Sequence, residues 1–234
     1  KQCNAALEEL ERPQELAPDY GLPKALAAWC WGQRAAHRFS STPDADRQRA
    51  SELADEAHNL APHDALTVTL SSGALVLLHR LEQADRRLER ALALDPWSPY
   101  AWVRRGWMSA YLGDADSAMR ELRTTLHMMP FEPVRRLSFI GVGCAHFIAE
   151  RYDRAALWVR SGLEGSPDCF WAQRIAVAAA ALMGARDEAR RMRRRLLRND
   201  PFLTAAEARR AWPFTSAFMD RLGDGLEIAG VPRE

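Results

Sequence analysis

The sequence has almost no net charge and no long hydrophobic run. Its 32 lysines and arginines nearly balance 31 aspartates and glutamates, so nothing draws the whole chain to nucleic acid or to an anionic membrane. No apolar run reaches the roughly 18 residues needed to cross a bilayer, and no signal-peptide core follows the first lysine. We therefore expect a cytoplasmic protein in which any basic surface is local.

Cysteines and metal-binding motifs are also scarce. The four cysteines form no C-x-x-C pair and suggest no disulfide framework, which is typical of a reduced, cytosolic protein. The six histidines have no zinc-binding spacing, and Cys144 and His146 would face different sides of a helix. No motif supports a catalytic triad, although a triad can assemble from distant residues. We expect no catalytic, cofactor-binding or metal-binding residues, and thus no enzyme.

What the sequence does contain is helix-forming residues in a repeating order. Alanine, leucine, arginine and glutamate dominate, so the chain is predicted to be all-α. Prolines that close amphipathic segments recur at intervals of 34, 34, 37 and 34 residues. They are Pro62, Pro96, Pro130, Pro167 and Pro201.

An alanine precedes each of these prolines by the same distance. The five alanines are Ala50, Ala84, Ala118, Ala155 and Ala189. A small residue repeated in phase indicates a close crossing of two helices, because a larger side chain would force them apart.

Each repeat divides into two helices around a turn, as in Tyr100–Leu112 and Ser117–Met128 on either side of Gly113. We predict five repeats within 19–201, at about 22–62, 65–96, 99–130, 136–167 and 170–201. The second helix of a truncated repeat precedes them at 1–18, where Pro13 should kink or shorten it. A cap follows at 202–234, with a capping box at Thr204 and Glu207 and an amphipathic helix through Phe218.

The repeat resembles the tetratricopeptide repeat. The motif W-x2-L-G-x2-Y, A-x3-F, P is represented by Trp102, Gly106, Ala118, Leu122 and Pro130. Arg105 replaces the leucine and Ser109 the tyrosine. The resemblance implies an α-solenoid, a right-handed superhelix of antiparallel helix pairs with a C-terminal capping helix. We expect Arg105 to extend into solvent or to pair with an acid such as Glu121.

Three longer segments carry a second resemblance. LAAWCWGQRAAHRF, AWVRRGWMSAYLGD and PFTSAFMDRLGDGLEIAGVP are similar to C-terminal repeat regions of bacterial proteins with a class III adenylate/guanylate cyclase domain or an OmpR/CadC-like winged-helix DNA-binding domain. This implies the regulatory or sensory part of a larger bacterial regulator. Its partner would be a protein segment, a small apolar ligand, its own output domain or a second copy.

In arrays of this family, the first helix of each repeat lines a concave groove. By phase, the expected groove is aromatic and lacks the lysines and asparagines of a carboxylate clamp. Its predicted partner contacts are Trp29, Tyr100, Val103, Trp107, Tyr111, Ile140, Cys144, Phe147 and Trp171, with Gln33, Leu66, Thr69, Leu137 and Arg174 in the same phase. Alternatively, these aromatics fill a tightly wound array or touch the cap. We favour partner contact for Tyr100, Trp107 and Tyr111.

An arginine-rich segment, RDEARRMRRRLLRND, follows Ala185. Its candidate anion patch comprises Arg190, Arg191, Arg194, Arg195 and Arg198. Because the net charge is near zero, we favour a solvated face balanced by acids of the cap such as Glu207, Asp220 and Asp224. Nucleic acid, anionic lipid and a neighbouring domain stay open as partners of this patch.

Overall fold

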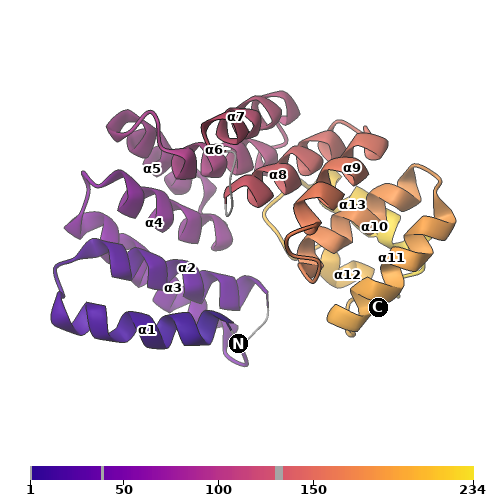
Figure 1. Ribbon diagram of the computed structural model, residues 1–234. Helices are drawn as coiled ribbons and strands as arrows, with labels where there is room; N and C mark the ends of the chain where they lie inside the picture. The colour runs from indigo at the N-terminus through magenta and orange to yellow at the C-terminus, as the bar shows by residue number, and fades with distance from the viewer. Residues whose placement is uncertain (1, 38–39, 130–133) are drawn as a thin grey trace. The chain divides into compact units, whose positions relative to one another are not determined.

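The structure, a computed structural model, describes residues 2–37, 40–129 and 134–234 (Figure 1). Pro130, which closes the third predicted repeat, lies outside these ranges. In the described residues there is no β-strand, and the all-α prediction is confirmed. The helices in these ranges are α1 (Gln2–Leu16), α2 (Gly21–Ala36), α3 (Pro43–Leu60), α4 (Ala65–Leu77), α5 (Leu81–Leu94), α6 (Pro99–Tyr111), α7 (Ala115–Met128), α8 (Val134–Ile148), α9 (Tyr152–Leu163), α10 (Phe170–Leu182), α11 (Arg186–Asn199), α12 (Ala205–Ala208) and α13 (Ser216–Ala229).

The chain forms two compact units, residues 1–104 and residues 105–234. In the first unit, α2 packs against α1, α3 and α4, and α4 packs against α5. In the second unit, α7 packs against α8, α8 against α9, and α10 against α9, α11 and α13. Most of these contacts join helices that are close together in the chain, as expected of a repeat array, whereas α13 packs chiefly against α10. Within the described ranges, no helix is long and apolar enough to cross a membrane.

The five alanines that recur in phase are all fully buried, as predicted. Glycines make similarly close approaches in the second unit. A Cβ added to Gly106 would come within 2.5 Å of Leu122 Cγ, and one added to Gly143 within 2.4 Å of Val159 Cγ2. The small residues therefore allow neighbouring helices to approach more closely than larger side chains would permit.

In the last four repeats, the turn between the two helices has a left-handed residue at one constant position. Gly113 and Gly184 have φ values of 84° and 85°, and each stands seventeen residues before the proline that closes its repeat. His79 and Glu150 occupy the same position in two other repeats, with φ values of 61° and 58°. The sequence signals the two glycine turns, whereas a histidine or glutamate in this conformation gives no such signal.

Local expectations at the two ends of the array have different outcomes. Helix α1 continues through Pro13 to Leu16, so the proline does not end it. The capping box is confirmed, because Glu207 N–H donates to Thr204 Oγ1 at 3.1 Å and Thr204 N–H to Glu207 Oε2 at 3.4 Å. The helix that this box begins, α12, ends at Ala208. Arg105 pairs with Glu121 at 3.7 Å, one of its two expected arrangements.

Candidate partner-binding surfaces

In the second unit, aromatic rings from several first helices meet the C-terminal segment. Trp107 of α6 lies 5.8 Å from Tyr111 and 5.7 Å from Trp171 of α10, measured between ring centroids. Tyr111 lies 4.7 Å from Phe214, and Trp171 lies 6.1 Å from Trp212. We call Trp212–Phe218 the tail segment. Two of its rings are therefore in contact with helices that were predicted to line the groove.

The other end of the tail segment reaches α8. Phe218 is fully buried, with its ring 3.9 Å from Phe214 in a stacked arrangement and 5.0 Å from Phe147. Arg221 of α13 pairs with Glu150, which follows α8. The tail segment is thus fixed to α6, α8 and α10. Contact with the cap, the alternative left open by the sequence, is what the structure shows for Tyr111, Phe147 and Trp171.

Several residues that were expected to contact a partner are instead in the core. Val103, Ile140, Cys144 and Phe147 are at most 1% exposed, and Trp107 is 6% exposed. Neighbouring helices cover these side chains, and in the second unit the tail segment adds to that cover. Burial also raises the pKa of the Cys144 thiol. Such side chains stabilise the fold and are not accessible to a partner in this structure.

The first unit keeps part of the predicted surface exposed. The guanidinium group of Arg104 in α6 lies over the indole of Trp29 in α2. The distance from the guanidinium carbon to the ring centroid is 3.9 Å. A Cβ on Gly73 of α4 would come within 2.9 Å of the same indole. Leu66 and Tyr100 lie in the first turns of α4 and α6 and are each 37% exposed. We call Trp29, Leu66 and Tyr100 the first-unit surface.

Other residues of the predicted groove are divided between surface and core. Gln33, Leu137 and Arg174 are half-buried, and Thr69 is buried with its hydroxyl donating to Ala65 O at 2.7 Å. Arg174 pairs with Asp200 at 2.5 Å, and its guanidinium lies 5.5 Å from the Trp212 ring. The arginine therefore contributes to the packing of the tail segment.

The five arginines of the candidate anion patch are all exposed on α11. Arg190 pairs with Asp187 at 3.5 Å and Arg195 with Asp168 at 3.4 Å. Of the cap acids expected to balance them, Asp224 pairs instead with Arg209 at 2.6 Å. The patch is thus exposed to solvent, and the acids that pair with Arg190 and Arg195 do not come from the cap.

The described residues contain no group of three metal-ligating side chains. Burial raises the pKa of the Cys30 thiol to about 11, and the pKa of Cys169 is also raised, chiefly by burial. These thiols are therefore protonated at neutral pH, whereas a reactive cysteine needs a lowered pKa.

No protein-family model matches the sequence. Tetratricopeptide repeat protein 33 from Homo sapiens is 33% identical over 79 residues, which cover 34% of this chain and 30% of the human protein. The Mus musculus protein of the same name is 27% identical over 122 residues, covering 44% of this chain and 47% of that protein. The chain thus spans less than half the length of the curated relatives that it matches.

Solved structures show the fold more completely. Cut9–Hcn1, an APC/C hetero-tetramer, matches with a TM-score of 0.71 at 14% identity over 94% of this chain and 40% of that chain. PilW, a type IV pilus biogenesis factor, matches with a TM-score of 0.61 at 17% identity, over 86% of this chain and 88% of the PilW chain. A tetratricopeptide repeat protein from Parabacteroides merdae matches with a TM-score of 0.55 at 14% identity, over 96% of this chain and 99% of that protein's chain. The chain therefore has the all-α fold of tetratricopeptide-repeat proteins.

Proposed function

We propose that this chain is a non-catalytic protein-interaction module that binds a segment of another protein at the first-unit surface. The observation that supports this is the way the second unit holds its own chain. There, first helices bind the tail segment through rings such as Tyr111 and Trp171. The first unit presents the same class of helices, with Trp29 and Tyr100 partly exposed.

The partner segment that suits this surface is apolar and carries an aromatic residue. Leu66 and Tyr100 offer an exposed aliphatic and an exposed aromatic side chain, and Trp29 presents an indole already held by Gly73 and Arg104. Rings held in place before binding lose little conformational freedom when a partner arrives. Tyrosine and tryptophan also supply a large share of the energy at protein interfaces.

Selection of peptides from a random library on the full chain, followed by titration, tests this proposal. We expect the Trp29→Ala/Tyr100→Ala double variant to bind a selected peptide at least about tenfold more weakly, with an unchanged helical spectrum. The matched control is Phe202→Ala, because Phe202 is an 88% exposed aromatic residue of the second unit. Equal affinity of the double variant and the wild type would exclude the first-unit surface.

We further propose that the module is the C-terminal sensory part of a larger bacterial cytoplasmic regulator. Support comes from the three segments that resemble the repeat regions of cyclase and winged-helix regulators. Partner binding would then change the activity of an output domain encoded upstream. The coding sequence that precedes Lys1 tests this proposal, since a cyclase or winged-helix domain supports it and an unrelated domain rejects it.

A second candidate function is accessory nucleic-acid binding by α11. The favouring observation is that Arg191, Arg194 and Arg198 are exposed on one side of the helix, where a phosphate backbone could contact them. A gel shift with duplex DNA at about 50 mM salt tests it. We expect the variant Arg191→Ala/Arg194→Ala/Arg198→Ala to release about three fewer counterions when it binds DNA, so that its affinity depends less on salt concentration. Arg47→Ala in the first unit should leave the salt dependence of binding unchanged. The absence of a shift for the wild type would remove this candidate.

A further inference from the structure

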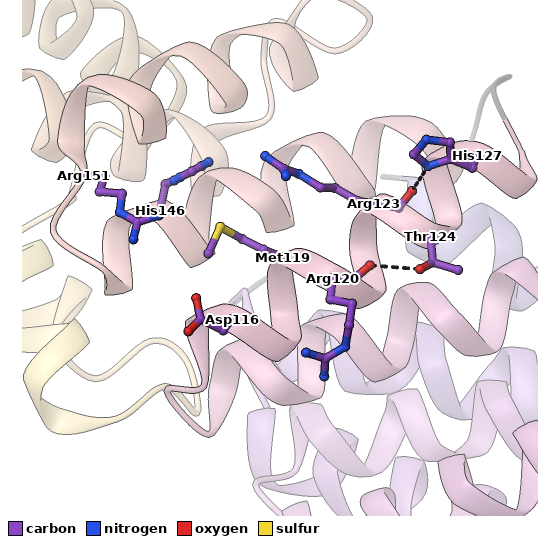
Figure 2. A pocket seen from close by; sticks show the side chains of 8 residues that line it. All are labelled: Asp116, Met119, Arg120, Arg123, Thr124, His127, His146 and Arg151. Carbon is purple, nitrogen blue, oxygen red and sulfur yellow. Dashed lines mark hydrogen bonds between the residues drawn. The ribbon is translucent and has the colours of Figure 1, made fainter.

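A basic pocket lies in the second unit, away from the aromatic contacts described above. It is an open cavity of about 690 Å³ between α7 and the corner that joins α8 to α9. Figure 2 shows that its lining comes from α7 on one side and from His146 and Arg151 on the other. The charged and titratable groups that line it are Asp116, Arg120, Arg123, His127, His146 and Arg151.

Positive groups outnumber negative ones in this lining, because Asp116 is its single carboxylate. Arg120 donates to Ser117 Oγ at 2.9 Å, and Arg123 lies 5.9 Å from the Trp158 ring. Among the residues that the structure describes, neither Arg123 nor Arg151 forms an ion pair with a carboxylate. Two exposed guanidinium groups therefore keep their full capacity to bind an anion.

His146 is the unusual member of the lining. It is 6% exposed, and neither ring nitrogen has a hydrogen-bond partner within the described part of the chain. In Figure 2, Arg123 extends from α7 towards His146, whereas Arg120 points away from it. A buried polar group without a partner is costly. An oxyanion in the pocket would accept a hydrogen bond from this ring.

The charges around His146 favour the same ligand. Burial is the main cause that lowers the pKa of His146, and the guanidinium groups of Arg123, Arg151 and Arg154 lower it further. Asp153 acts in the opposite direction. The neutral imidazole is therefore surrounded mainly by positive charge. A bound dianion would offset that charge and allow His146 to take up a proton.

We propose that this pocket binds a small doubly charged oxyanion of the phosphate class, held by Arg123, Arg151 and His146. Arginine forms paired hydrogen bonds to phosphate oxygens, and the imidazole supplies a further donor. A monovalent carboxylate would leave more of the positive charge uncompensated. The ligand is either free phosphate or the phosphoryl group of a small metabolite. The proposal does not depend on the first-unit surface.

Calorimetric titration of the full chain tests the site, with inorganic phosphate and O-phosphoserine as the two probes at constant ionic strength. We expect saturable binding of at least one probe and a loss of at least about tenfold in affinity for Arg123→Gln and for Arg151→Gln. Both arginines are exposed, so neither substitution disturbs the core. Arg191→Gln on α11 is the control with the same change of charge.

The relative affinities identify the source of the phosphoryl group. Tighter binding of phosphate indicates the free ion, and tighter binding of O-phosphoserine indicates a phosphorylated metabolite. Either result supports the site. Equal losses for Arg191→Gln and Arg123→Gln would show attraction to charge in general and overturn the proposal. The absence of saturation by both probes would overturn it as well.

A second measurement isolates His146. Sulfate keeps its charge between pH 7.5 and 5.5, so a change in its affinity over this range reports on the protein. We expect sulfate to bind more tightly at the lower pH, and the ring-proton titration of His146 in NMR spectra to move to higher pH when sulfate is present. His146→Gln should remove the pH dependence. An unaltered His146 titration in saturating sulfate would contradict its role.

Discussion

Trp29 of the first unit and Trp107 of the second occupy the same position in their repeats, yet their surroundings differ. Each lies against a glycine of the next repeat. A Cβ on Gly73 would be 2.9 Å from Trp29 Cζ3, and one on Gly141 would be 3.2 Å from Trp107 Cε2. Trp29 is then half-buried beside Arg104, whereas Trp107 is 6% exposed beside Trp171. One sequence position therefore has two different environments.

The two rings beside Trp107, those of Tyr111 and Trp171, are themselves in contact with the tail segment. In the second unit it adds the rings of Trp212, Phe214 and Phe218 to the first helices. An exposed apolar surface of a repeat array is usually covered by a cap or by a partner. The comparison indicates that the second unit meets this requirement within its own chain, and it leads us to place partner binding in the first unit.

Loss of the tail segment's contact should have the largest effect on stability. Phe218→Ala removes a fully buried ring that touches Phe147 and Phe214, so we expect a loss of about 3–5 kcal/mol in the free energy of unfolding. Urea denaturation measures it, and hydrogen exchange should locate the weakening in the second unit. Phe202→Ala, at an 88% exposed ring, should change stability by less than about 0.5 kcal/mol. Similar losses for the two variants would contradict the packing described for the tail segment.

Substitution of the two equivalent tryptophans tests the comparison directly. Trp107→Ala should lower the free energy of unfolding by about 3 kcal/mol or more, because the Trp107 ring is almost completely buried. Trp29→Ala should cost about 1–2 kcal/mol, since its ring is half-buried and loses one cation–π contact. Urea denaturation of the two single variants provides the measurement. The comparison fails if Trp29→Ala is the more destabilising change.

The two glycines under these tryptophans sharpen the same contrast. In Gly141→Ala the new methyl group would lie 2.7 Å from the fully buried Leu122, so we expect a loss of about 1–3 kcal/mol. In Gly73→Ala it would lie 2.9 Å from the half-buried indole of Trp29, and the gain in helix propensity of about 1 kcal/mol offsets the contact. Thermal unfolding should therefore place Gly73→Ala close to the wild type. A larger loss at Gly73 would show that Trp29 is as tightly held as Trp107.

The smallest effect concerns acid stability, for which the units should behave alike. Burial is the main cause that lowers the pKa of His58 and His79 in the first unit and of His146 in the second. The unfolded chain then binds protons more readily than the folded chain. The free energy of unfolding should be constant above about pH 7 and fall as pH decreases below the ordinary histidine value of about 6.5.

Urea denaturation at pH 7.5 and 5.5, in buffers free of phosphate and sulfate, measures this effect. His146→Gln should reduce the loss of stability between the two pH values, and so should His79→Gln. If both variants lose as much stability as the wild type, the histidines are not responsible for the acid sensitivity.

Much of the fold was predictable because the repeat depends on residues that recur at regular spacing and lie near one another in the chain. Ala84 and Ala118 are buried as expected, and Gly113 and Gly184 adopt the left-handed turn conformation. The equivalent turns at His79 and Glu150 were not predictable, since neither residue favours that conformation. There the packing of the flanking helices imposes a conformation that the residue itself disfavours.

The candidate sites were less predictable, because helical phase indicates which face a side chain occupies but not what covers it. Ile140 and Phe147 have the expected phase and are nevertheless fully buried. His146 gave no signal of a site, since its spacing to other ligating residues is not that of a metal motif. Its relation to Arg123 arises from the packing of α7 against α8.

The sequence by itself determined the helices, their repeat and their close crossings, because each depends on residues near one another in the chain. Only the tertiary structure decided which aromatic rings remain accessible and which cations share a pocket. Arg221 and its partner Glu150 are 71 residues apart, and the tail segment reaches α6 from more than a hundred residues away. Such contacts depend on how the chain returns upon itself, and a local pattern contains no information about that return.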